Sequence, residues 1–160
     1  GKLGCARAAL ILSKERTPKK EFKIFKKFLR TPKPRIQIGE KISNIANSCI
    51  DISDGLIKDL GNIIFSSKLG ATINLERIPT HHLIKKVIDP KKYYECIIGG
   101  GEDYELCFTA HNSKRKKIEN ISSLARVPIT LIGKVTKKNL IFLDNGIVKK
   151  IKFKGFDHFA

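Results

Sequence analysis

The segment Asp51-Ile52-Ser53-Asp54-Gly55-Leu56 places two carboxylates three residues apart. Apolar residues before it predict a buried strand, and the pattern after it predicts a helix, so both acids would face one point beyond the strand. Magnesium prefers hard oxygen ligands, and one or two carboxylates usually hold it together with substrate phosphates. Free N–H groups at the start of the helix would favour a phosphate beside the metal. Asp51 and Asp54 are therefore candidate magnesium ligands.

The same residues also have a purely structural interpretation. Ser53 is a good N-cap for the predicted helix, and Asp54 would complement the helix dipole without binding any ligand. The spacing of the two acids alone favours neither interpretation over the other.

A second segment combines glycines with acids and reads Gly99-Gly100-Gly101-Glu102-Asp103-Tyr104-Glu105-Leu106. Glycine lets a backbone approach a ligand closely, and the adjacent acids Glu102 and Asp103 can engage a cation or a donor group. The segment is neither a P-loop nor a dinucleotide-binding loop, because the lysine and the glycine spacing of those motifs are missing. On the glycines alone, a tight turn into a strand with solvated acids is the favoured alternative.

The elements that must position these segments follow from hydrophobic periodicity. Strands are predicted at 48–52, 71–75, 104–110, 127–135 and 140–143, with a hairpin turn at 144–146 leading into 147–153. Helices are predicted at 5–13, 21–29, 39–47, 53–69, 80–87 and 112–125; Gly70 caps the fourth, which carries Asp59 on its polar side. This mixture predicts an α+β fold in which a mixed β-sheet is flanked by helices. The length and a hydrophobic content of 41% fit one domain over residues 1–160.

The composition limits the choice of partners and of compartment. A net charge of +17 would suit a polyanion, but the basic residues are spread along the whole chain, which favours general surface basicity over a nucleic-acid interface. Cys5, Cys49, Cys96 and Cys107 share no Cys-x-x-Cys spacing and lie in apolar stretches. They predict reduced, buried thiols in a cytoplasmic protein, without zinc or disulfides. No apolar run has the length of a membrane span.

Taken together, the two segments closely resemble the paired signatures of thiamine-phosphate kinases. Further matches are Arg35-Ile36 after a proline, Gly70-Ala71, Ile78-Pro79, Ile132-Gly133 and the terminal Gly155-Phe156-Asp157-His158-Phe159. The resemblance implies the C-terminal α+β domain of the ATP-binding superfamily shared with aminoimidazole ribonucleotide synthetase and selenophosphate synthetase. The chain would then be the C-terminal half of a two-domain enzyme.

The resemblance also implies roles for individual residues. In similar kinases the acids that match Asp51 and Asp54 bind magnesium, the serine that matches Ser53 contacts ATP, and the acid that matches Glu102 contacts the thiamine moiety. An aromatic residue near the C-terminus lies against the substrate ring, and Phe156 is assigned that role. Supporting positions in the same motif are Gly100, Gly101 and Asp103.

The reaction implied is the ATP- and magnesium-dependent phosphorylation of thiamine phosphate to thiamine diphosphate. The family's N-terminal domain supplies further magnesium-binding acids, so this chain alone is expected to be inactive, and the complete enzyme is expected to be a homodimer. Three alternatives stay open. They are another synthetase of the superfamily with a different acceptor, a basic nucleic-acid-binding module, and a remnant that folds but has lost catalysis.

Overall fold

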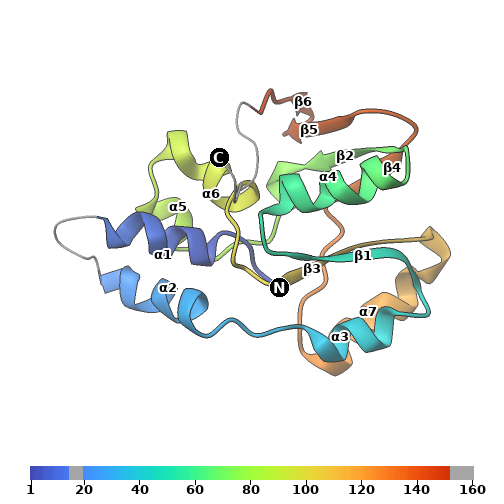
Figure 1. Ribbon diagram of the computed structural model, residues 1–160, viewed down its shortest axis with the longest axis horizontal. Coiled ribbons are helices and arrows are strands. Elements are labelled where there is room, and N and C mark those ends of the chain that lie inside the picture. The colour runs from blue at the N-terminus through green and yellow to red at the C-terminus, as the bar shows by residue number, and fades with distance from the viewer. Residues whose placement is uncertain (15–19, 152–160) are drawn as a thin grey trace.

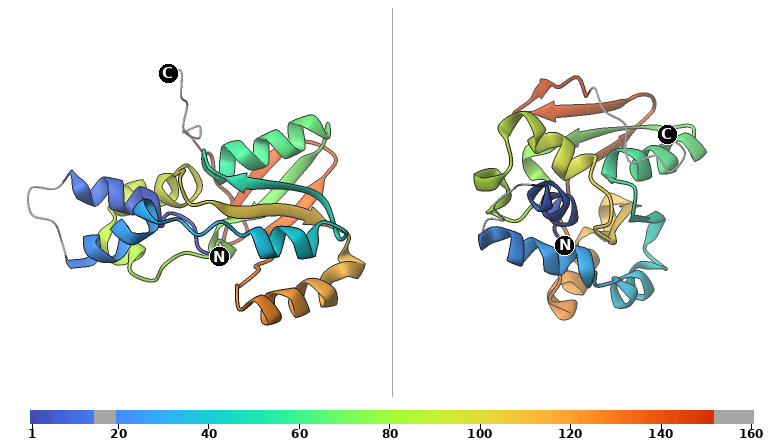
Figure 2. Two further views of the ribbon diagram at one scale, coloured as in Figure 1. Left: turned by 60° about the horizontal axis from the view of Figure 1, so that its bottom comes forward. Right: turned by 60° about the vertical axis from the view of Figure 1, so that its left-hand side comes forward.

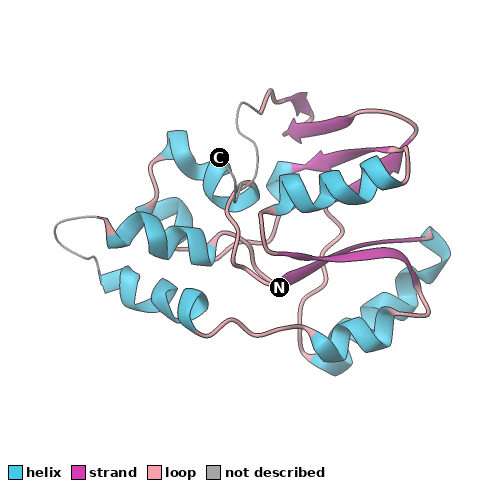
Figure 3. Cartoon of the chain, in the orientation of Figure 1, coloured by secondary structure: helices cyan, strands magenta, loops and turns pink. Residues whose placement is uncertain are grey.

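The computed structural model describes residues 1–14 and 20–151 of the chain, which contain both helices and strands (Figures 1 and 3). The α-helices are α1 (Cys5–Ser13), α2 (Lys20–Arg30), α3 (Ile36–Ile42), α4 (Leu56–Ser66), α5 (Ile84–Val87), α6 (Tyr93–Ile98) and α7 (Arg115–Ala125). The strands are β1 (Ala46–Ile52), β2 (Gly70–Asn74), β3 (Glu105–Ala110), β4 (Gly133–Thr136), β5 (Leu140–Asp144) and β6 (Ile147–Val148). Among the described residues, no helix has both the length and the apolar character that a membrane span requires.

The strands form two sheets. In the smaller one β1 and β3 pair antiparallel, with Asp51 opposite Leu106 and Ile52 opposite Glu105. The larger one has the order β4-β2-β5-β6, in which β2 is antiparallel to β4 and parallel to β5. A mixed sheet with helices around it confirms the predicted α+β fold. The hairpin predicted at 144–146 is also present and joins β5 to β6.

Helix α4 connects the two sheets, because it packs against β1 and also contacts β2 and β3. In Figure 1, α1, α2, α5 and α6 gather at the end of the molecule where β1 finishes. Helices α3 and α7 pack against each other on the far side of the β1–β3 pair (Figure 2). The end of β1 and the start of β3 pair with each other at the end of the ladder that faces these four helices.

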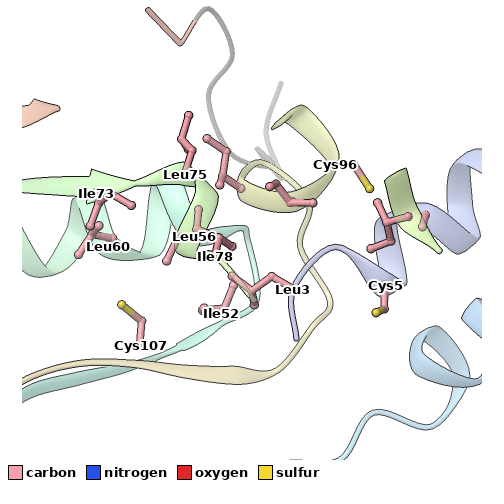
Figure 4. Close-up of a cluster of buried hydrophobic side chains, with 14 of the residues drawn as sticks. Leu3, Cys5, Ile52, Leu56, Leu60, Ile73, Leu75, Ile78, Cys96 and Cys107 are labelled. Atoms are coloured by element: carbon pink, nitrogen blue, oxygen red, sulfur yellow. The ribbon is translucent and has the colours of Figure 1, made fainter. Parts of the chain in front are cut away.

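The main hydrophobic core lies between these layers and includes buried side chains from α1, α4, β2 and α6. Figure 4 shows that Ile52 and Leu56, the two large apolar residues of the acidic segment, lie within this cluster with Leu60 and Ile73. Burying apolar surface contributes about 25 cal/mol per Å², so the core fixes both ends of the acidic segment. A second cluster between α3 and α7 contains Ile38, Ile42, Ile45 and Ile121.

Several predicted boundaries were wrong, and each has a local cause. Helix α3 begins at Ile36 instead of residue 39, because each proline restricts only the residue before it, and the last residue restricted in this way is Lys33. The strand predicted at 127–135 is restricted to Gly133–Thr136. Of the strand predicted at 147–153, the described residues up to 151 form only Ile147–Val148, and residues 152 and 153 lie outside the described part of the chain. In both regions the apolar pattern continues beyond the hydrogen-bonded ladder.

The predicted burial of the cysteines holds for three of the four. Cys5, Cys96 and Cys107 are buried, and burial raises the pKa of each thiol to about 12. Cys49 is exposed, because it lies on the outward-facing side of β1 together with Asp51. An apolar sequence neighbourhood was therefore a poor guide to burial in this alternating strand.

Candidate functional site

The first acidic segment forms the turn between β1 and α4. Asp51 is exposed at the end of the strand and Asp54 is half-buried in the turn. The Asp54 carboxylate lies 2.9 Å from the Lys58 ammonium group, one helical turn further along α4. Both acids thus lie at the end of β1, as the sequence predicted.

Ser53 is not the N-cap of α4, and the helix begins later and ends earlier than the 53–69 predicted. The N-cap is Gly55, which makes no side-chain capping bond, and the C-cap is Ser67; Gly70 already belongs to β2. The capping acceptor is instead Asp59 from inside the helix.

Asp59 is 3% exposed. Its Oδ2 atom accepts hydrogen bonds from the backbone N–H groups of Ser53, Asp54 and Gly55, at 3.1, 3.0 and 3.1 Å. Burial raises the pKa of Asp59, and the three N–H donors oppose that shift. These N–H groups are therefore already bound, contrary to the expectation that they are free for a phosphate.

The assignment of Asp59 to the polar side of the helix was wrong. It lies three residues after Leu56 and four before Ile63, both of which are buried. These are the spacings that place residues on the same face of a helix. An acid inside an apolar stripe was the signal that could have identified it, since a buried carboxylate must find hydrogen-bond donors.

The glycine-rich segment runs beside the acidic turn and continues the β1–β3 ladder beyond its end. The N–H groups of Glu102 and Tyr104 donate to the carbonyl oxygens of Ser53 and Ile52, each at 2.9 Å. Gly55 has φ +110°, and a Cβ there would lie 2.8 Å from the carbonyl carbon of Gly99. The two segments, far apart in sequence, therefore form one structural unit.

Glu102 and Tyr104 bring a further acid and a ring to this unit. Both have left-handed backbone conformations, with φ of 68° and 50°, which side chains other than glycine and asparagine adopt rarely. The Tyr104 hydroxyl donates to Glu102 Oε2 at 3.2 Å. The pKa of Tyr104 is raised, first by the charge of Glu102 and by the hydrogen bond to it. The charges of Asp51 and Asp54 raise it further. Asp51, Asp54 and Glu102 thus all act on one hydroxyl, and we call the surface that these three acids share the acidic face.

The donor set at this face suits magnesium when other groups complete its coordination. Asp51 and Asp54 offer hard carboxylate oxygens. Among residues 1–14 and 20–151, no group of three or more His, Cys, Asp or Glu side chains is placed to hold a metal ion. Magnesium keeps several waters and commonly takes one or two carboxylates together with substrate phosphates. The two acids therefore fit part of a magnesium site, and the remaining ligands must come from elsewhere.

Asp103 has a different environment from the other acids of its segment. Its two carboxylate oxygens accept hydrogen bonds from the N–H groups of Gly4 and Ala6, at 2.6 and 3.3 Å. It therefore anchors the start of α1. Burial raises the pKa of Asp103 to about 7, although these N–H donors lower it.

This raised pKa predicts that stability falls as the pH rises. The pKa is 3.8 without the folded environment and about 7 in the folded chain, so the folded chain holds this proton more tightly. The contribution of Asp103 to the free energy of unfolding is complete below pH 3.8 and is lost as the pH rises through about 7. The loss should be at least about 1 kcal/mol. Urea unfolding near pH 5 and near pH 8 should show the loss in the wild type and a smaller one in Asp103→Asn. Equal pH dependence in both proteins would contradict the assignment.

Glu105 and Arg35 form an ion pair that was not singled out from the sequence. Arg35 donates to both carboxylate oxygens of Glu105, each at 2.7 Å, and Glu105 is 8% exposed. Burial raises the pKa of Glu105, but the hydrogen bonds and charge of Arg35 outweigh it, and the net pKa is lowered. The alternation of β3 places Glu105 on the same inward side as Cys107. An acid at an inward strand position was therefore the available signal.

A cavity of about 640 Å³ lies between β3, α7 and the segment leading into β4. Its lining is largely apolar and includes Ile52 and Leu56. None of the acids Asp51, Asp54 and Glu102 lines this cavity. The acidic face is thus separate from this cavity and lies on the surface.

The remaining predicted site residues are placed as follows. Ser53 lies in the turn, half-buried, with its N–H bound to Asp59. Gly100 is buried, and a Cβ there would meet the Cys96 carbonyl oxygen at 2.5 Å, so it is packed tightly against α6. Phe156 falls outside the described residues. The structure therefore brings together Asp51, Ser53, Asp54, Gly101 and Glu102, while Asp103 faces α1.

Comparison with known proteins adds independent information. The sequence matches the family described as AIR synthase related protein, C-terminal domain, over residues 6–144. It is 40% identical over 139 residues to the thiamine-monophosphate kinase of Escherichia coli K12, covering 86% of this chain. The fold is similar to the crystal structure of thiamine-monophosphate kinase from Stenotrophomonas maltophilia K279a, with a TM-score of 0.82 and 28% identity over 93% of this chain. It is also similar to a structure described as AaThiL complexed with AMPPCP and TMP, with a TM-score of 0.75 and 28% identity over 99% of this chain.

In each case the similarity covers only part of the other protein. The match covers 42% of the Escherichia coli kinase and 49% of each of the two solved chains. The chain therefore spans about half the length of the curated relatives it matches. The family match extends over most of the chain and includes both the acidic turn and the glycine-rich segment. The chain belongs to the AIR synthase related protein family and corresponds to its C-terminal domain.

Proposed function

We propose that the chain supplies the C-terminal part of the site in an enzyme that phosphorylates thiamine phosphate to thiamine diphosphate with ATP and magnesium. The observation that carries this proposal is the pairing of the acidic turn with the glycine-rich segment through the hydrogen bonds of Glu102 and Tyr104. The similarity to thiamine-monophosphate kinases supports the choice of substrate. A similar structure described as a complex with AMPPCP, an analogue of ATP, and TMP supports ATP as the phosphoryl donor.

In the proposed reaction, an oxygen of the thiamine phosphate attacks the γ-phosphorus of ATP, and ADP leaves with its bridging oxygen. The acceptor is already ionised near neutral pH, so no base is required. Positioning and charge neutralisation then provide most of the rate enhancement. Magnesium, when bound, would neutralise phosphate charge.

The residues predicted from the sequence have the following roles in this proposal. Asp51 and Asp54 hold magnesium, and Ser53 contacts the ATP. Glu102 is exposed and electronegative, which suits contact with the cationic ring of thiamine. Phe156 would lie against the same ring, and Gly100, Gly101 and Asp103 support the loop.

The chain itself is proposed to be one domain of a two-domain, homodimeric, cytoplasmic enzyme. The surface position of Asp51, Asp54 and Glu102 supports the need for a second domain, because a phosphoryl-transfer site must exclude water. The buried reduced thiols Cys5, Cys96 and Cys107 support a cytoplasmic location. The N-terminal domain would add further magnesium ligands and cover the acidic face.

The test is an assay of ATP- and magnesium-dependent conversion of thiamine phosphate to thiamine diphosphate. The complete gene product and the 160-residue chain are assayed side by side, and we expect turnover only from the complete product. Thiamine, in place of its phosphate, serves as the control acceptor and should not react. A folded complete product that turns over another acceptor of the superfamily, or none, would contradict the proposal.

A further inference from the structure

The turn between β1 and α4 has the backbone of an anion-binding site. The N–H groups of the three consecutive residues 53–55 converge on a single point, immediately before a helix of 11 residues. Consecutive amides of this kind, at the positive end of a helix dipole, commonly bind phosphate. In this chain the point of convergence is the Oδ2 atom of Asp59, so the anion comes from the protein itself.

The buried position of Asp59 keeps a phosphate from binding the three N–H groups of the turn. Its carboxylate is buried, whereas Asp51 is exposed and Asp54 is half-buried. A phosphate could bind the three amides only by displacing a buried carboxylate that the chain holds in place. It would also meet the charges of Asp51 and Asp54. A divalent cation is instead attracted by all three carboxylates, and it would compete with the Lys58 ammonium group for Asp54.

We propose that Asp59 is a positioning residue that makes the β1–α4 turn select a divalent cation over a free phosphate. It fixes the backbone that carries Asp51 and Asp54, and it occupies the amides that would otherwise bind an anion. ATP and thiamine phosphate would then reach this turn through the metal instead of through its backbone. This deepens the proposed function, because it rests on Asp51 and Asp54 as magnesium ligands.

The test separates the charge of Asp59 from its geometry. In Asp59→Asn, the side-chain oxygen can still accept from the three amides, but the negative charge is gone. Removing one charge near a divalent ion should weaken magnesium binding about tenfold, a value between the limits for water and for a protein surface. Asp59→Ala removes the acceptor oxygen as well as the charge, so a folded Asp59→Ala should begin to bind inorganic phosphate at the freed amides. Both affinities are measured on the 160-residue chain from the backbone amide NMR signals of residues 53–55, with Mg²⁺ alone and with inorganic phosphate alone.

Asp89→Asn is the matched control. Asp89 is an exposed acid whose Oδ1 accepts from the N–H of Lys91 at 2.8 Å at the start of a 3-10 helix (Pro90–Lys92), so the same chemistry is removed at another place. This variant should leave both affinities of the turn within about twofold of the wild type.

The wild-type chain alone can already overturn the proposal. Larger shifts of the 53–55 amides with phosphate than with Mg²⁺ at the same millimolar concentration would show that the turn does not prefer a cation. Unchanged Mg²⁺ affinity in a folded Asp59→Asn would show that Asp59 does not determine it. Because binding is measured without turnover, a failure here is distinguishable from an absence of kinase activity.

Discussion

Replacing Asp54 with asparagine in the complete gene product is expected to lower kcat about 100-fold or more, because a lost carboxylate ligand removes several kcal/mol of metal-dependent stabilisation. Asparagine keeps the size of the side chain and one oxygen, so the turn should retain its shape. The rate should recover partly at high magnesium concentration, since the defect is one of metal binding. The measurement is kcat as a function of magnesium concentration in the wild type and the variant.

The control for Asp54→Asn must account for the ion pair that is lost with it. Lys58 lies 2.9 Å from the Asp54 carboxylate, so Lys58→Gln breaks the same pair while leaving the acid in place. A partly exposed pair of this kind is worth about 0.2–1 kcal/mol, so Lys58→Gln should change kcat by less than about fivefold. A similar loss of activity in both variants would show that the ion pair, and not the metal, is what matters.

Gly101→Ala is expected to separate the two segments of the site. A Cβ on Gly101 would overlap the carbonyl oxygen of Ser53, which is backbone and cannot move aside as a side chain can. Overpacking of this kind typically costs about 1–3 kcal/mol of stability. Because the displacement falls on the bond between Glu102 N–H and the Ser53 carbonyl, activity should fall about 100-fold, as expected for a misplacement near 1 Å.

Gly61→Ala provides the matched comparison in the same protein. Gly61 lies inside α4, and a Cβ there would have no heavy atom within 4 Å. Alanine should therefore stabilise the helix by about 0.5–1 kcal/mol and leave activity unchanged. Urea unfolding and kcat on both variants test this contrast. Normal activity in a folded Gly101→Ala would mean that the close approach of the two segments is not needed.

The sequence predicted most of what depends on local pattern. Periodicity placed α1, α2 and α7 within a few residues, and the Asp-Asn-Gly turn located the β5–β6 hairpin. The acids Asp51 and Asp54 were also placed correctly at the end of β1. Each of these features depends on residues that are close together in the sequence, so it could be predicted without knowing the contacts between distant segments.

What the sequence did not reveal depends on contacts between distant segments. Asp59 and Glu105 are polar residues at inward positions, and their partners could not be named from spacing alone. Asp103 was expected to engage a cation or a donor group, and it accepts from two N–H groups at the start of α1, which the sequence could not name. Adjacent residues in an extended or turning backbone point in different directions, and the sequence does not show which partner each direction meets.

The hydrogen bonds from Glu102 and Tyr104 to the end of β1 also have a kinetic consequence. The two segments that form the acidic face are separated in the chain by α4, β2, α5 and α6, so neither can hold its active shape before the long loop between them has closed. Loop closure must be completed before such contacts contribute any stability, which makes them late events in folding. The acidic face is therefore expected to form together with the β1–β3 ladder, and local opening at this end of the ladder should disrupt the site.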